Sequence, residues 1–169
     1  MTDTRETDAR PGSLERLVTG WALLGGGVLA VVVAVNVWTV AASVLGSAFP
    51  GTFELTEIGV AIAAFMFLPY CQLTGQNVTA DIFTARSGPR LKALLTALGS
   101  AVALGFAALL LWRMTLGMLD QKGFALTSTI LQVPIWWAFL PILISLALLV
   151  ASAAATLRDA LATTGSPDA

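Results

Sequence analysis

The chain has 169 residues, of which 57% are hydrophobic and only 11% are charged, and its formal net charge is −1. A soluble domain of this size carries about 25% charged residues, so the composition excludes an ordinary soluble protein and indicates a membrane protein. The near-zero net charge says little about partners, and no basic patch indicates nucleic acid as a partner.

The charges are confined to a few short segments of the chain. Stretches without any charge cover 17–53, 58–80, 93–112 and 123–157. A helix needs about 20 apolar residues to cross a bilayer, and every backbone polar group must be paired inside it. The pattern therefore predicts an all-α integral membrane protein with four transmembrane helices, at about 17–45, 56–74, 92–117 and 134–157.

The four helices form one predicted membrane domain, 14–158. The polar segment 1–13 before it is expected to be a disordered cytoplasmic tail, and 159–169 a second cytoplasmic tail. Inside the first predicted helix, Asn36 is a single polar group in an apolar run. Such a group in a membrane helix favours a hydrogen bond to a neighbouring helix over a substrate contact.

The second predicted helix starts with two carboxylates, Glu54 and Glu57. Ionisable groups in membrane segments are candidates for functional sites. Arg113 lies about one turn from the outer end of the third helix, at a depth similar to that of Glu57. We therefore expect these two opposite charges to pair, either within the chain or with a partner. Because a transport carboxylate belongs nearer the middle of the membrane, a structural role is favoured.

The link between the second and third helices, 75–90, contains apolar residues at helical spacing, bounded by Asp81 and Arg86. Acidic residues suit a helix N-terminus and basic residues a C-terminus. This pattern predicts a short amphipathic helix at about 78–87, which lies in the cytoplasmic interface.

The third predicted helix carries small residues four apart, at Ala97, Ala101 and Gly105. Small residues allow membrane helices to approach closely, so this face is a candidate for packing inside the bundle or onto another subunit. In the fourth helix, Pro134 suits the first helical turn and Trp136 the outer interface. Pro141 lies deeper and is expected to kink the helix.

Positive charge indicates the orientation, because Lys and Arg concentrate on the cytoplasmic side. With the N-terminus inside, the outer segments hold only Lys122. The inner segments hold Arg5, Arg10, Arg16, Arg86, Arg90, Lys92 and Arg158. Both termini are therefore expected in the cytoplasm.

The residues that most catalytic and metal sites need are scarce. The chain has no histidine and one cysteine, Cys71. This excludes histidine-ligated haem, most zinc sites and any nucleophile–histidine pair. No phosphate-binding or dinucleotide-binding motif is present. The sequence therefore predicts no catalytic, cofactor or metal site, and no enzyme.

Three segments give the chain a resemblance to a known family. These are the start of the second helix with its Glu, 54–57; the segment Gly75-Gln-Asn77-Val-Thr-Ala-Asp81-Ile; and the segment Ser128-Thr-Ile-Leu-Gln-Val-Pro134-Ile-Trp136, with Pro141 further on. The chain resembles the small membrane subunit, DctQ-like, of the tripartite ATP-independent periplasmic (TRAP) transporters, over about 13–157. Asn77 stands where the family tends to have histidine.

The resemblance implies a non-catalytic small permease subunit in a bacterial or archaeal inner membrane. It implies two protein partners besides membrane lipid. A large polytopic subunit carries an organic acid with sodium ions, and a periplasmic substrate-binding protein delivers the substrate. The small subunit would scaffold and anchor the large one, with Glu54, Glu57, Asn77, Asp81 and Arg113 as structural or interface groups.

The residues alone leave two other functions open. One is the small subunit of a tripartite tricarboxylate transporter, against which the Asp81 segment and Pro134 argue. The other is a stand-alone four-helix exporter that acts as a homodimer, with Glu57 as its proton site. A central carboxylate in the first helix would favour the exporter, and the first helix has none.

Overall fold

A computed structural model of the chain describes residues 12–46, 50–75 and 89–164, with side chains for all of these except 89–94, 96 and 162–164. The described residues contain four helices and no β-strand. The helices are α1 (Ser13–Val44), α2 (Thr52–Leu73), α4 (Pro89–Gly123) and α5 (Trp136–Thr164). All four are long and apolar enough to cross a membrane, which agrees with the prediction of four transmembrane helices.

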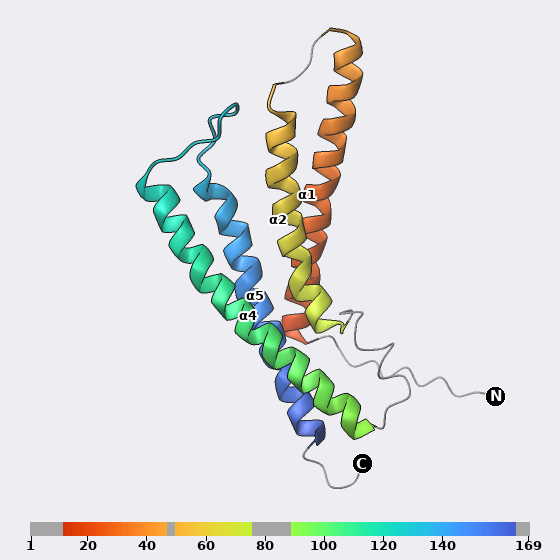
Figure 1. Cartoon of the computed structure of the whole chain (residues 1–169). Coiled ribbons are helices and arrows are strands. Elements are labelled where there is room, and N and C mark those ends of the chain that lie inside the picture. Colours follow the sequence, from red (N-terminus) through yellow and green to blue (C-terminus); the bar gives the residue numbers. More distant parts are fainter. Residues whose placement is uncertain (1–11, 47–49, 76–88, 165–169) are drawn as a thin grey trace, which may run out of the picture.

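The helices pack in the order α1, α2, α5, α4. Consecutive helices pair within two hairpins, α1 with α2 and α4 with α5, and α2 packs against α5 to join the hairpins. Figure 1 shows the hairpins close together at the end where α1 starts and α5 ends, and splayed apart at the other end. The bundle is therefore a V, and the start of α1 and the end of α5 lie on the same side.

The observed helices extend beyond several of the predicted limits. For example, α2 starts at Thr52 rather than at 56, and α4 ends at Gly123 rather than at 117. The prediction followed the apolar runs, whereas a helix continues through polar residues for as long as its backbone bonds are made. At about 1.5 Å per residue, the 35 residues of α4 exceed the roughly 30 Å of the hydrocarbon core. Hence α4 must tilt or project from the membrane.

The start of α5 corrects one prediction. Pro134 was expected in the first helical turn, but α5 begins at Trp136. Instead, Pro134 forms an isolated bridge with Thr127, which closes the loop before the helix. Pro69 lies inside α2, where it is fully buried, and Pro141 lies inside α5. The predicted interfacial helix at 78–87 lies outside the described residues, as do Asn77 and Asp81.

Candidate functional site

The loop between α4 and α5 is folded tightly on itself. The backbone N–H of Ser128 donates to the carbonyl of Val133 over 2.9 Å, and Ile135 donates to Leu126 over 3.1 Å. The Ser128 hydroxyl in turn accepts a longer bond, 3.4 Å, from the Val133 N–H. The chain reverses at Gln132, whose φ is +55°. These bonds make residues 126–135 a compact unit, which we call the outer loop after the side of the membrane on which the sequence predicts it.

Glu54, in the first turn of α2, binds the tip of the outer loop. Its Oε1 accepts a hydrogen bond from the Thr129 N–H, and its Oε2 accepts one from the Leu131 N–H, each over 3.0 Å. Hydrogen bonds to an ionised carboxylate are stronger than those between neutral groups. In Figure 1 the loop between α4 and α5 reaches toward the start of α2. Glu54 therefore ties the two hairpins together at their splayed ends.

The backbone just before α2 fits against the same loop. Gly51 has a φ of +96°, a conformation that favours glycine. A Cβ at this position would lie 2.9 Å from the Leu131 side chain, so the glycine leaves room for the loop. Sequence reasoning singled out Glu54 and the segment from Ser128 to Pro134 separately. Their contact was missed because the donors are backbone amides, which no residue type marks.

The predicted charge pair of Glu57 with Arg113 is not formed within the chain. Glu57 and Arg113 are both exposed, and no ion pair joins these two described residues. A pairing of either group with a partner stays a prediction. At the outer end of α4, Lys122 instead places its Nζ 5.4 Å from the centre of the Trp136 ring, within reach of a cation–π interaction. Trp136 also meets Trp137 edge to face, with centroids 6.0 Å apart.

Two polar bonds and two glycines hold α1 against α2. Asn36 Nδ2 donates to Thr56 Oγ1 over 2.7 Å, which confirms the predicted hydrogen bond between helices. One turn further along α1, the hydroxyls of Thr39 and Thr52 lie 3.0 Å apart. Closer to the inner end, Gly25 packs on Met66, and Gly59 packs on Val32 so closely that a Cβ would overlap the valine.

The small residues of α4 divide between two faces. Ala97 is buried, but Ala101 and Gly105 are exposed. A step of four residues turns a helix by about 400°, so the row drifts away from α5 by roughly 40° at each step. In the packing inside the bundle, Ala97 is joined by Ser100 and Ala107, which are also buried. A role of Ala101 and Gly105 in a subunit contact stays a prediction.

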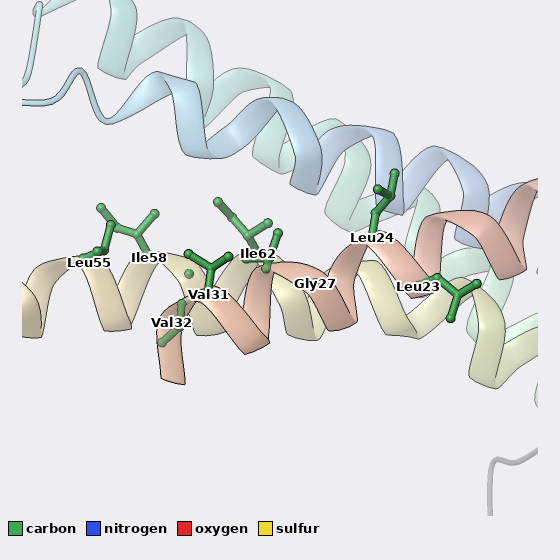
Figure 2. Close-up of a pocket in the computed structure, with 10 residues that line it drawn as sticks. Leu23, Leu24, Gly27, Val31, Val32, Leu55, Ile58 and Ile62 are labelled. Carbon is green, nitrogen blue, oxygen red and sulfur yellow. The ribbon is translucent and has the colours of Figure 1, made fainter. Parts of the chain in front are cut away.

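An apolar groove runs along α1 and α2, with a volume of about 590 Å³. In Figure 2, Leu24, Ile58 and Ile62 point from these helices toward α5. The groove therefore lies in the opening of the V. The groove is lined only by apolar side chains and glycines: Leu23, Leu24, Gly27, Val28, Val31, Val32, Leu55, Ile58, Gly59 and Ile62.

The polar contacts of the described residues are structural ones. Among the described residues, no three His, Cys, Asp or Glu side chains are grouped so that they could hold a metal ion. The polar groups placed above, Glu54, Asn36 and Thr39, are bonded to a neighbouring helix or to the outer loop. Their chemistry is that of locking helices together.

A comparison with protein families finds one match that covers most of the chain. The model of the DctQ component of the tripartite ATP-independent periplasmic transporters matches residues 29–163. This range includes all of α2, α4 and most of α5, and with them the contact between Glu54 and the outer loop. Neither the curated proteins nor the solved structures gave a match. The chain therefore belongs to the DctQ family, the small membrane component of TRAP transporters, and is a multi-pass membrane protein.

Proposed function

We propose that this chain is the non-catalytic small permease subunit that scaffolds and anchors the large, sodium-coupled subunit of a TRAP transporter for the uptake of an organic acid. The observation that carries the proposal is that polar side chains of its membrane helices are bonded to other parts of the same chain. Asn36 bonds Thr56, Trp21 bonds Ser145, and Glu54 bonds the outer loop. These bonds hold the helices in place. The three side chains Asn36, Trp21 and Glu54 are therefore not available to bind a solute.

The outer surface of the bundle supports a partner in the membrane. α4 packs on α5, and its opposite side presents a row of large exposed apolar side chains: Leu95, Leu98, Val102, Leu109, Trp112, Leu116 and Leu119. Such a surface suits lipid or the helices of a large polytopic subunit. The exposed groups Ala101, Gly105 and Arg113 of α4, and Glu57 of α2, are the contacts we assign to that subunit, together with Asn77 and Asp81.

The proposed placement is the bacterial or archaeal inner membrane, with both termini in the cytoplasm. The Lys and Arg distribution supports this orientation. The structure agrees with it in one respect, because α1 starts and α5 ends on the same side of the bundle. The splayed end with Glu54 and the outer loop would then face the periplasm, the side from which a substrate-binding protein approaches.

The test is a mild-detergent purification of the tagged chain from its native membrane, followed by mass spectrometry of the proteins that accompany it. We expect a large polytopic membrane protein to co-elute in near-equal amount. Elution of the chain alone as a homodimer would contradict the scaffold function. In that case Glu57→Gln should be assayed for loss of transport by the isolated protein, with Glu15→Gln, at the inner start of α1, as a matched control.

A further inference from the structure

The two hairpins are joined by polar contacts at opposite ends of the V. Toward the closed end, the Trp21 Nε1–H of α1 donates to the buried Ser145 Oγ of α5 over 2.9 Å. At the open end, the Glu54 carboxylate of α2 accepts from Thr129 and Leu131 in the outer loop. The hairpins are thus tied where they meet and again where they are furthest apart.

Between these two ties the facing surfaces offer little that would fix an angle. The groove in the opening is lined by apolar side chains and glycine. Contacts between apolar groups have no preferred direction, and lipid tails compete with them on nearly equal terms. The packing of α2 on α5 limits their crossing angle, and across the groove it is the directional contact at the outer end that can fix the separation of the open ends.

The Glu54 contact is suited to that task because both of its sides are built on rigid elements. Glu54 stands in the first turn of α2, and the outer loop is braced by its own bonds, Ser128 to Val133 and Ile135 to Leu126. Each carboxylate oxygen has a donor of its own, so the pair of bonds fixes both distance and orientation. Since the loop connects α4 with α5, holding the loop positions both helices.

We infer that Glu54 is a positioning residue, whose carboxylate sets the separation of the two hairpins at the outer end of the bundle. One consequence rests on the proposed function: the separation of the hairpins decides which surface the scaffold presents to the large subunit. The positioning itself is a property of this chain alone. Failure of the chain to bind a large subunit would therefore leave it standing.

The experiment measures distances in the full chain in lipid nanodiscs by double electron–electron resonance. With Cys71→Ala as background, spin labels are attached through Val40→Cys in α1 and Leu119→Cys in α4, two exposed positions near the outer end. A second pair, Leu17→Cys and Leu98→Cys, is exposed and reports on the inner half of the same helices.

In Glu54→Ala the outer pair is expected to shift to a longer mean distance and a broader distribution, while the inner pair keeps its distance. Glu54→Gln keeps the size of the side chain but turns one acceptor into a donor, which faces another donor. It should give an intermediate shift, and it serves as the readout if Glu54→Ala does not fold. Glu57→Ala is the matched control on the same helix and should change neither pair.

Two results would overturn the inference. If the outer distance in Glu54→Ala and Glu54→Gln equals that of the parent, the carboxylate does not set the separation. If the inner and outer pairs change together, Glu54 supports the whole fold and has no specific positioning role.

Discussion

The Nδ2 of Asn36 in α1 donates a hydrogen bond of 2.7 Å to the Oγ1 of Thr56 in α2, and the Thr56 hydroxyl in turn donates to the Thr52 carbonyl over 2.8 Å. We predict that Asn36→Ala lowers the free energy of unfolding by about 0.6 kcal/mol, and by at most roughly 1.7 kcal/mol, the range of hydrogen bonds between membrane helices. Reversible unfolding of the parent and the variant in bicelles measures this change in the free energy of unfolding.

A double-mutant cycle isolates this bond from other effects of the substitutions. Asn36→Ala, Thr56→Ala and the double variant should show a coupling energy of the same size as the single loss. Val37→Ala, an exposed neighbour in α1, is the control for a change in side-chain volume. A coupling energy indistinguishable from zero would mean that the bond contributes nothing to α1–α2 association.

The contact of α1 with α2 predicts opposite effects at two neighbouring glycines. In Gly25→Ala the new Cβ would lie 2.8 Å from the Met66 Cβ, and in Gly59→Ala it would overlap Val32. Overpacking of this kind costs about 1–3 kcal/mol. Gly26→Ala meets nothing within 4 Å and should be neutral or stabilising. Thermal unfolding in detergent separates the cases, and equal midpoints for Gly25→Ala and Gly26→Ala would refute the close packing.

Two buried serines of α5, seven residues apart, should also respond differently. Ser145 is 1% exposed, accepts from Trp21 and donates to the Pro141 carbonyl. Ser152 is 0% exposed, and within the described part of the chain its hydroxyl has no hydrogen-bond partner. Ser145→Ala leaves the Trp21 N–H without its acceptor and should destabilise by about 1 kcal/mol.

Ser152→Ala removes a buried hydroxyl that makes no bond, so it should be neutral or stabilising. The two variants differ from the parent by the same single atom, which makes each the control for the other. The measurement is the free energy of unfolding, again in bicelles. A loss in Ser152→Ala equal to that in Ser145→Ala would show that Ser152 has a bonding partner in the folded protein.

Glu57 and Arg113 are exposed and not joined to each other, so their effects should appear only in the assembled transporter. We predict that Glu57→Arg and Arg113→Glu leave the melting temperature of the isolated chain unchanged but weaken co-purification of the large subunit. A lower melting temperature of the isolated chain in either variant would instead indicate a pairing within the chain. If the large subunit is retained in full, these charges are not part of its contact.

The sequence was sufficient for those features of the fold that the bilayer itself imposes. Charge-free stretches marked the four spans because a membrane excludes charge over a known thickness. A hydrogen bond from Asn36 to a neighbouring helix could be predicted, because an amide in lipid must find a partner. That the partner is Thr56 could not be predicted. Spacing was misleading for α4, where a row four residues apart leaves the contact face within two turns.

The contact at the outer end was beyond sequence reasoning for a physical reason. Glu54 is 77 residues away from Leu131, and its donors are main-chain amides that every residue except proline carries. Opposite charge is the usual guide to a partner, and here it pointed from Glu57 to Arg113. The resemblance did contain the answer in part, because two of its three segments, the one at Glu54 and the one that starts at Ser128, meet in space.

The packing order α1, α2, α5, α4 has a consequence for how the protein is made. Each hairpin unites helices that follow one another in the chain, whereas the two hairpins meet through distant segments, chiefly α2 and α5. During synthesis, which proceeds from the N-terminus, the first hairpin can therefore be complete before α4 is inserted. The second then forms by local contacts, and the last step is the docking of two finished pairs, in which Glu54 must meet a loop that has already folded.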